Sequence, residues 1–351
     1  MRSSTISCAD ALAQRDAFDA VIDVRSPTEF ADDHLPGAIN CPVLDDDERR
    51  LVGTQYRQES AFAARRSGAA LVARNIARFL QTGFADLPPR WRPLVYCWRG
   101  GQRSAAMVHV LSAVGWRACQ LDGGYRAFRR QVIGDLEILP QRYGFQVLCG
   151  PTGSGKSRLL RHLAQQGAQV LDLEALARHR GSVLGAIPRS PQPSQKHFET
   201  ELWRVLQSFD ARLPVFVEAE SRKVGQLRLP DALLERMRGA RCVELCLPDV
   251  ARVRLLREEY AHYEADIGAL LQQLDCLTPL HGREQVAAWK QLATAGAWDE
   301  MVARLLGEHY DPAYRRSVDR NYLLSGEARI LRIDSNRGED FDRAAAELRA
   351  G

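Results

Sequence analysis

Gly150-Pro151-Thr152-Gly153-Ser154-Gly155-Lys156-Ser157 is the stretch that decides the fold of the second half of this chain. It has the G-x-x-x-x-G-K-S spacing of a phosphate loop, in which backbone N–H groups surround a di- or triphosphate. The flanks agree, because residues 145–149 are apolar enough for a buried strand and residues 156–165 favour a helix. We therefore predict an α/β domain whose phosphate-binding residues are Gly150, Thr152, Gly153, Ser154, Gly155, Lys156 and Ser157.

Cys97-Trp98-Arg99-Gly100-Gly101-Gln102-Arg103-Ser104 is a second motif, placed between a strand predicted over 94–96 and a helix predicted over 105–114. Its glycines let successive backbone N–H groups point inward, and the helix N-terminus adds partial positive charge, with Ser104 as the expected N-cap. This field, reinforced by Arg103 and Arg99, favours the thiolate of Cys97. We therefore expect Cys97 and Arg103 to be catalytic, in an anion-binding loop that also includes Trp98, Arg99, Gly100, Gly101, Gln102 and Ser104.

Three carboxylates lie at or just after predicted strand ends in the second half of the chain. Asp172 and Glu218 each end a predicted strand, and Glu220 follows Glu218 by two residues. The carboxyl ends of parallel strands carry the ligand sites of open α/β sheets, so each carboxylate could assist the phosphate loop or a metal ion. An ordinary strand-end role explains them equally well. We therefore assign no metal ligands. The Ser157 hydroxyl of the phosphate loop could hold Mg²⁺.

The composition is that of an ordinary globular protein and excludes several classes. With 45% hydrophobic and 26% charged residues, the chain is neither disordered nor collagen-like. No apolar run approaches a membrane span and the N-terminus lacks a secretory signal, so we expect a cytoplasmic protein without a membrane partner. The formal net charge of +4 permits an anionic partner without requiring one. Eight cysteines without a Cys-x-x-Cys pair indicate mostly buried thiols.

Alternating strand and helix patterns divide the chain into two α/β domains. Strand, helix and strand follow one another in the first part, which predicts a parallel sheet domain over residues 1–138. The second domain is predicted over 139–351. Strand signals disappear at about 249–325, where Trp298 and Met301 belong to an amphipathic helical pattern, so we predict a helical insertion there.

The first third of the chain resembles rhodanese domains. Val21-Ile22-Asp23-Val24-Arg25-Ser26-Pro27-Thr28-Glu29-Phe30, followed by His34-Leu35-Pro36-Gly37-Ala38-Ile39-Asn40, is similar to their opening signature. The resemblance implies a rhodanese-like domain whose persulfide-forming cysteine is Cys97. Small rhodaneses usually place four residues between cysteine and arginine, whereas five separate Cys97 from Arg103, as in rhodanese-fold phosphatases. The longer loop favours a substituted phosphate as its ligand.

This domain, followed by a P-loop NTPase-like domain, closely resembles the bacterial tRNA 2-selenouridine synthase family. Leu121-Asp122-Gly123-Gly124-Tyr125-Arg126, His179-Arg180-Gly181-Ser182 and Glu218-Ala219-Glu220-Ser221-Arg222-Lys223 extend the resemblance beyond the two motifs. It implies a transferase that replaces sulfur by selenium in wobble 2-thiouridine of tRNA. The co-substrates it implies are selenophosphate and geranyl diphosphate, which alkylates the sulfur first. A selenophosphate supply enzyme would be a natural partner.

On that basis we expect Lys156 and the phosphate loop to hold the diphosphate of geranyl diphosphate. Cys97 is expected to take selenium from selenophosphate, attack the alkylated base and expel the geranyl thiol. Two groups of arginines in the predicted helical insertion are expected to contact the tRNA backbone, although solvated helix faces explain them equally well. These residues are Arg252, Arg254, Arg257, Arg315, Arg316 and Arg320.

Other functions remain open from the sequence. The motif from Cys97 to Ser104 also fits a cysteine phosphatase, although no general acid is identifiable. A rhodanese-fold sulfurtransferase or sulfur carrier, coupled to a nucleotide-binding loop at Lys156, is a second alternative. A P-loop kinase would explain the second half and leave Cys97 without a role. The sequence does not decide whether the loop binds a nucleotide or geranyl diphosphate.

Overall fold

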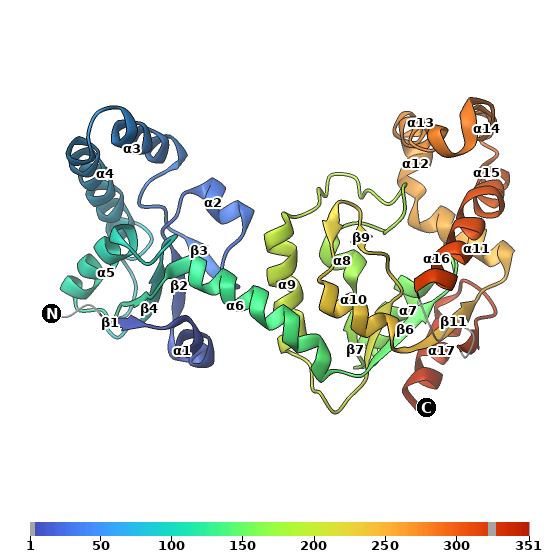
Figure 1. The fold of residues 1–351 in the computed structure, drawn as a ribbon, viewed down its shortest axis with the longest axis horizontal. Coiled ribbons are helices and arrows are strands. Elements are labelled where there is room, and N and C mark those ends of the chain that lie inside the picture. Colours follow the sequence, from blue (N-terminus) through green and yellow to red (C-terminus); the bar gives the residue numbers. More distant parts are fainter. Residues whose placement is uncertain (1–3, 322–327, 351) are drawn as a thin grey trace. The chain divides into compact units, whose positions relative to one another are not determined.

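The computed structural model describes residues 4–321 and 328–350, with the side chains of residues 317–321 excepted. The chain forms two compact units (Figure 1). Unit 1 comprises the residues up to Asp135 together with Ser194–Arg204, and unit 2 comprises Leu136–Pro193 and the residues from Val205 on. Each unit contains one parallel five-stranded sheet with helices around it, which confirms the predicted α/β class.

The sheet of unit 1 has the strand order β1-β5-β4-β2-β3, and all its pairings are parallel. All four residues of the central strand β4 are buried, as expected for a strand covered on both faces. The strands are β1 (Ser4–Ile6), β2 (Ala20–Asp23), β3 (Ala38–Asn40), β4 (Pro93–Tyr96) and β5 (Cys119–Leu121). The helices are α1 (Cys8–Ala13), α2 (Pro27–Asp32), α3 (Asp46–Gln58), α4 (Ala61–Gln81), α5 (Gln102–Val114) and α6 (Gly124–Ile138).

Helix α5 begins earlier than the sequence predicted, and the expected N-cap is wrong. Gly101 occupies the N-cap position and Ser104 lies inside the first turn, fully buried. The Ser104 hydroxyl oxygen lies 3.1 Å from the Gly101 carbonyl oxygen and 3.2 Å from the Cys97 sulfur, so it contacts the cysteine loop from within the first turn. The predicted end is confirmed, because Gly115 stops the helix with a left-handed backbone, φ 109°.

The sheet of unit 2 has the order β12-β11-β6-β8-β7 and is also parallel throughout. Its strands are β6 (Phe145–Cys149), β7 (Gln169–Leu171), β8 (Val215–Glu218), β11 (Arg241–Cys246) and β12 (Arg329–Arg332). A hairpin of β9 (Lys223–Val224) and β10 (Leu227–Arg228) lies outside this sheet. The flanking helices are α7 (Lys156–Gln165), α8 (Leu173–Ala177), α10 (Asp231–Arg238) and α17 (Gly338–Ala350). The predicted strand, phosphate loop and helix around Lys156 are therefore confirmed.

Between Asp249 and Asn321 the described residues form helices only, as predicted for the insertion. Residues 322–325 of that prediction lie outside the described part of the chain. The helices are α11 (Asp249–Glu259), α12 (Ala261–Ala265), α13 (Ile267–Asp275), α14 (Thr278–Thr294), α15 (Trp298–Leu305), the π-helix η3 (Leu306–Tyr310) and α16 (Asp311–Asn321). They pack around a core of their own, in which Trp289 is fully buried. Among the described helices, none combines the length and apolarity needed to cross a membrane.

The compact units differ from the predicted domains in two places: unit 2 begins at Leu136, and a segment that includes most of helix α9 (Gln195–Gln207) belongs to unit 1. Ser194–Arg204 belongs to unit 1, although it follows the predicted boundary at residue 138. A buried hydrogen bond joins this segment to unit 1, because the Thr200 hydroxyl donates to the buried Asp33 carboxylate at 2.9 Å. Unit 1 is therefore built from two separate stretches of sequence.

Candidate functional site

Cys97 lies directly after β4, at the carboxyl end of the central strand of the unit 1 sheet. The residue is only 3% exposed, so its sulfur is held by the loop that follows. The Gly101 N–H and the Ser104 hydroxyl both donate to the sulfur at 3.2 Å. The loop therefore surrounds the sulfur with donors, as the sequence predicted for an anion-binding site.

Two glycines allow this loop to lie against the turn after β5. Gly100 has φ +65°, and a Cβ there would be 2.6 Å from the Leu121 carbonyl oxygen. A Cβ on Gly124 would be 2.2 Å from the Cys97 carbonyl oxygen. No larger side chain fits either position without moving backbone. The Gly123-Gly124 turn therefore supports the cysteine loop directly.

The surroundings of Cys97 lower the pKa of its thiol. Burial alone would raise it, but this effect is outweighed by hydrogen bonds from the Ser104 hydroxyl and from the Ser104 and Arg99 N–H groups, and by the charge of Arg103. The thiolate is thus present below the pH at which an ordinary cysteine ionises. A buried thiolate held by donors is a nucleophile suited to an anionic substrate.

We expect Ser104→Ala to raise the pKa of Cys97, because the variant removes a donor to the thiolate. A hydrogen bond to a charged group contributes about 1.5–3 kcal/mol, so the midpoint of thiol alkylation should move up by about one to two pH units. The measurement is the alkylation rate of the Cys97 peptide against pH, read by mass spectrometry. Ser112→Ala, at the other end of α5, is the control. An unchanged midpoint in Ser104→Ala would contradict this account of the loop.

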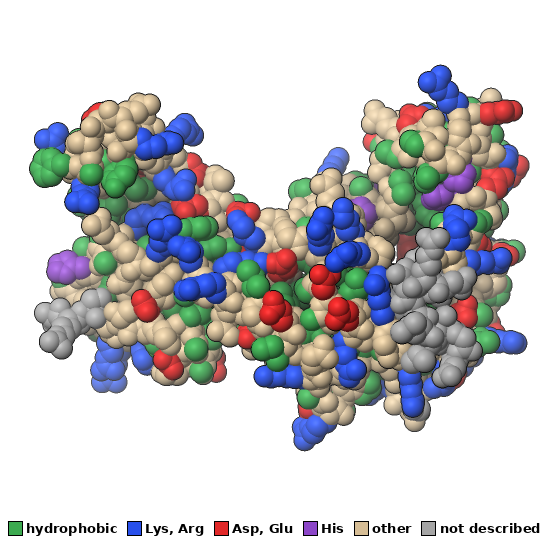
Figure 2. Space-filling model, in the orientation of Figure 1, with side chains coloured by type: hydrophobic (Ala, Val, Ile, Leu, Met, Phe, Trp, Pro, Cys, Tyr) green, Lys and Arg blue, Asp and Glu red, His purple; other side chains and the backbone are tan. Residues whose placement is uncertain are grey.

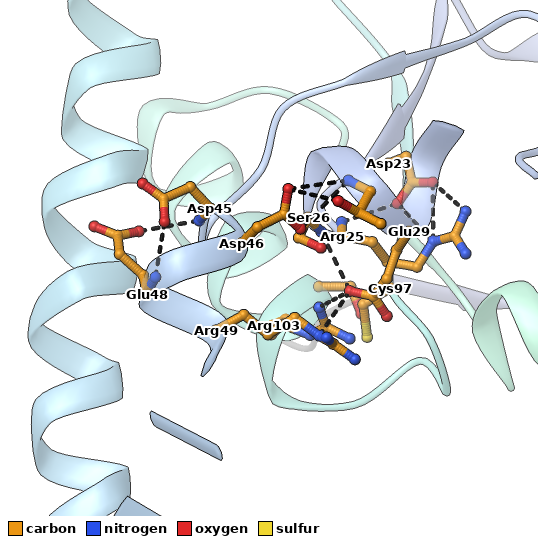
Figure 3. A network of polar contacts seen from close by, with 12 residues as sticks. Asp23, Arg25, Ser26, Glu29, Asp45, Asp46, Glu48, Arg49, Cys97 and Arg103 are labelled. Atoms are coloured by element: carbon orange, nitrogen blue, oxygen red, sulfur yellow. Dashed lines mark hydrogen bonds and ion pairs between the residues drawn. The ribbon is translucent and has the colours of Figure 1, made fainter. Parts of the chain in front are cut away.

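Arg103 belongs to an ion-pair cluster with Glu29 and Arg49 at the cysteine loop. Its guanidinium donates to Glu29 at 2.9 Å, and Arg49 from α3 contacts the same carboxylate at 3.1 Å (Figure 3). Burial of Glu29 would raise the pKa of its carboxyl, but the hydrogen bond and charge of Arg103 and the charge of Arg49 hold it below its ordinary value. The charged Glu29 therefore joins two arginines at the edge of the cysteine loop, and an incoming anion would compete with it for Arg103.

The phosphate loop connects β6 to α7 and has the geometry that its sequence predicts. Gly155 has φ +88°, and a Cβ there would be 2.6 Å from the Phe341 ring. The Lys156 ammonium donates to the Gly150 carbonyl at 2.8 Å, so it lies across the loop. The Gly150 N–H donates to the Tyr314 hydroxyl of α16, which anchors the start of the loop. Backbone N–H groups and one ammonium thus surround a space suited to phosphate.

Carboxylates from two strand ends meet the phosphate loop. The Ser157 hydroxyl donates to Glu174 at 2.8 Å and to Glu218 at 3.2 Å. Oxygen atoms of Glu174, Glu218 and Glu220 lie within 4.8 Å of one another. Asp172 plays a different part, because its side chain caps α8 by accepting the Ala175 N–H at 2.8 Å. Two of the three carboxylates singled out in the sequence therefore lie together, joined by Glu174, which the sequence did not single out.

These three carboxylates are poorly stabilised as anions. Burial and the neighbouring carboxylates raise the pKa of Glu218 well above its ordinary value. Burial and the charge of Glu174 raise the pKa of Glu220 to about 8. A bound cation would reduce the repulsion between these carboxylates. Their oxygens and the Ser157 hydroxyl are the ligands that Mg²⁺ prefers. The donor set therefore fits a divalent cation next to the phosphate loop.

Arg180 adds a positive charge on the same side of unit 2. It lines the pocket formed with the phosphate loop, and its guanidinium lies 4.7 Å from the centre of the Tyr260 ring. One of its nitrogen atoms, Nη1, is buried without a hydrogen-bond partner among the described residues. An anionic ligand in the pocket would supply that partner.

A cavity with almost entirely apolar walls adjoins this pocket. Helices α11, α12, α13 and α15 provide most of its lining, including Leu270, Trp298 and Met301. Four residues line both the cavity and the phosphate pocket: Thr152, Leu256, Tyr260 and Tyr310. The apolar cavity therefore shares part of its wall with the phosphate pocket.

Comparison with known proteins assigns both units. A family model described as the tRNA 2-selenouridine synthase AAA domain matches residues 143–273, and a rhodanese-like domain matches residues 7–131. The tRNA 2-selenouridine synthase of Nitrosomonas europaea is 38% identical over 264 residues, 74% of this chain and 68% of that protein. The synthase of Hydrogenovibrio crunogenus is 35% identical over 321 residues, 84% of this chain and 88% of that protein. The chain belongs to the tRNA 2-selenouridine synthase family.

Within this family member, two of the six arginines expected to contact RNA, Arg252 and Arg257, are engaged by other parts of unit 2. Arg252 is buried, and its guanidinium donates to Asp311 at 2.6 Å and to the Thr152 carbonyl at 2.9 Å. Arg257 pairs with Glu264 at 2.8 Å and with Asp299 at 3.0 Å. Of the other four arginines expected to contact RNA, the side chain of one, Arg320, lies outside the described residues. The other three lie in described helices: Arg254, Arg315 and Arg316. The sequence pattern could not separate structural arginines from free ones, because their partners are distant in the chain.

Proposed function

We propose that this protein replaces sulfur by selenium in the wobble 2-thiouridine of tRNA, using selenophosphate, after S-geranylation of the base with geranyl diphosphate. Membership of the family supports the overall reaction. The observation that carries the geranylation step is the apolar cavity beside the phosphate loop. A nucleoside triphosphate offers no long apolar group for such a cavity, whereas a prenyl diphosphate has a charged head and a hydrocarbon chain.

In the first step, the phosphate loop and Lys156 bind the diphosphate, and the geranyl chain enters the apolar cavity. The thione sulfur of the base attacks the first carbon of the geranyl group, and diphosphate leaves with the electrons of the carbon–oxygen bond. Arg180 lines the same pocket, and its Nη1 atom has no hydrogen-bond partner in the described part of the chain, which supports a contact with the same diphosphate. Preorganised positive groups at a departing diphosphate stabilise the charge that develops there.

In the second step, Cys97 and its loop act on selenophosphate. We expect the Cys97 thiolate to attack the phosphorus atom of the selenophosphate group and not its selenium atom. Transfer of neutral selenium to the thiolate would leave phosphorus two electrons more reduced, as phosphite. Selenium first adds to the base and expels the geranyl thiol; the Cys97 thiolate then takes the phosphoryl group, and water releases phosphate. The support is the thiolate-stabilising loop, whose cysteine and arginine are spaced for a phosphate group. A trapped Cys97 adduct without the isotope pattern of selenium would agree with this assignment, and a selenium-containing adduct would reverse it.

Mg²⁺ fits the carboxylate cluster of unit 2. Ser157, Glu174, Glu218 and Glu220 would hold it, and the ion would offset the negative charge of a bound diphosphate. Without a cation, these carboxylates would repel the diphosphate as well as one another. Geranylation should therefore depend on a divalent cation, whereas the step at Cys97 should not.

A phosphatase, the rival function, needs a general acid in the groove beside Cys97 to protonate the leaving group. Three carboxyl groups from the described residues line that groove: Glu29, Asp32 and Asp46. The pKa of Glu29 lies below its ordinary value despite burial, because of Arg103, and that of Asp46 is lowered by its hydrogen bond with Ser26. Both are anions at neutral pH, and Asp32 pairs with Lys196 at 2.6 Å. Neither Glu29 nor Asp46 therefore supplies the proton that a leaving alkoxide needs.

The test is mass analysis of nucleosides from tRNA that carries 2-thiouridine, incubated with the purified protein. With both co-substrates we expect 2-selenouridine, and with geranyl diphosphate alone S-geranyl-2-thiouridine. Selenophosphate alone should give neither product. Selenation at the full rate without geranyl diphosphate would contradict the proposed order of steps.

Filling the apolar cavity should impair geranylation selectively. Met301→Trp adds a large side chain to the cavity wall, so we expect the KM for geranyl diphosphate to rise at least about tenfold, consistent with a loss of about 1.4 kcal/mol of binding. Binding of inorganic diphosphate should change little. Leu280→Trp, at an exposed position of α14, is the matched control. Equal KM values for geranyl diphosphate in the two variants would contradict the proposal that the apolar cavity binds the geranyl chain.

A further inference from the structure

A groove on unit 1 leads to the cysteine loop. Its lining includes Arg50, Tyr56 and Arg57 of α3, together with Trp98 and Arg103 of the cysteine loop. All these residues belong to unit 1, so the groove is complete within that unit. It continues over α3 and α4, which lie side by side (Figure 1). We call this surface the α3 groove.

The α3 groove is positively charged. Five basic and three acidic side chains line it, a net charge of +2. The acidic groups are engaged, since Glu29 and Asp32 accept basic groups and Asp46 accepts the Thr28 hydroxyl at 2.8 Å. Among the residues that the structure describes, Arg50 pairs with Asp47, and both side chains are more than 70% exposed, so water screens the pair. Lys and Arg side chains are prominent over this part of the unit (Figure 2). The α3 groove therefore suits a polyanion.

Aromatic side chains accompany these charges. Tyr56 is 59% exposed on α3, although a charged helix face has no packing need for it. Trp98 is half-buried, and its ring stacks on Tyr125 with centroids 5.3 Å apart. Exposed aromatic rings among basic side chains are typical of surfaces that bind unpaired bases. The charge and the rings together distinguish a single-stranded nucleic acid from a simple anion.

We propose that the α3 groove binds the anticodon loop of the substrate tRNA and delivers the wobble uridine to Cys97. The inference rests on the proposed function, because it takes the base as the substrate of the cysteine loop. Cys97 is only 3% exposed, so the base must leave its stack to reach it. The neighbouring nucleotides then lie over the α3 groove. Arg50 and Arg57 contact their phosphates, and Tyr56 stacks on a base.

The experiment measures the binding of an anticodon stem-loop RNA carrying 2-thiouridine to the full chain at several salt concentrations. Arg50→Glu/Arg57→Glu should weaken binding at least about tenfold and lower the salt slope by about 0.7 for each lost phosphate contact. The control is Arg78→Glu/Arg90→Glu, which makes the same charge change at exposed positions of unit 1 outside the groove. Equal affinity and salt slope in the two double variants would overturn the proposal.

Tyr56 supplies a second readout. Tyr56→Ala should weaken RNA binding roughly 5- to 150-fold, as expected for a lost stacking contact, with an unchanged salt slope. Tyr56→Phe keeps the ring and should bind as the unsubstituted protein does. Failure of Tyr56→Phe to restore binding would contradict stacking. In every variant, unchanged alkylation of Cys97 shows that the loop is intact.

These measurements need neither selenophosphate nor geranyl diphosphate, so they separate two failures. If RNA binds through the α3 groove but no modified nucleoside forms, the proposed function fails and the groove assignment stands. If 2-selenouridine forms and the groove variants bind RNA as the control does, the groove assignment fails alone.

Discussion

Cys97→Ser is expected to abolish selenation while geranylation continues. Serine keeps the size of the side chain, but its hydroxyl ionises far above neutral pH and cannot form the nucleophile that the loop stabilises. Loss of a nucleophile typically lowers a rate by 10³-fold or more, so formation of 2-selenouridine should fall at least about that much. Geranylation should continue, because the phosphate loop and apolar cavity belong to unit 2. The base that has exchanged its geranyl thiol for selenophosphate, with the phosphoryl group still on selenium, should accumulate. Nucleoside mass analysis over time measures both products.

The control for this variant is Cys276→Ser, since Cys276 is an exposed free cysteine of the helical insertion. It should carry out geranylation and selenation at the rates of the unsubstituted protein. Simultaneous loss of geranylation and selenation in Cys97→Ser, with the fold intact, would contradict the division of the two steps. So would full selenation without the thiol.

Lys156→Ala should fail first at geranyl transfer. The ammonium lies across the phosphate loop, 2.8 Å from the Gly150 carbonyl, where it can contact a bound diphosphate. Removing one preorganised group of this kind lowers a rate by about 10²- to 10³-fold. The variant should still convert tRNA that already carries S-geranyl-2-thiouridine, because that step needs only Cys97 and its loop. Rates on the two tRNA substrates measure the contrast.

Lys290→Ala is the matched control, because this lysine pairs with Asp275 in the insertion, away from the phosphate loop. Its geranylation rate should be unchanged. An undiminished geranylation rate in Lys156→Ala would contradict a role for the phosphate loop in geranyl transfer. A loss on both tRNA substrates would instead assign the loop to a step common to them.

The sequence predicted the parts of both sites that are continuous in the chain. The phosphate loop and α7 lie where spacing placed them, because consecutive residues set the geometry of this motif. The cysteine loop also has its predicted donors, although Ser104 acts through its hydroxyl on the sulfur and not as a helix cap. Local patterns are sufficient for such motifs, because their geometry is set within a few residues.

The sequence could not predict the features that distant residues assemble. Glu174 joins Glu218 only because β7 and β8 are neighbours in the sheet. Glu29 reaches Arg103 across 74 residues. The apolar cavity takes its walls from several helices, each of which shows only an ordinary amphipathic pattern. Pairing of this kind depends on tertiary packing, which periodicity and spacing do not encode.

Because α9 returns to unit 1, the two activities cannot be separated by cutting the chain once. A fragment that ends at residue 138 would lack Thr200 and His197, which face the Asp33 carboxylate at 2.9 and 3.6 Å. Asp33 has no exposed surface, and stripping partners from a buried charge costs about 3–5 kcal/mol, a large share of the stability of a small domain. Loss of selenation in such a truncated protein would report its instability and say nothing about Cys97. Complementation between separately expressed halves should instead keep residues 194–204 with the cysteine-bearing half.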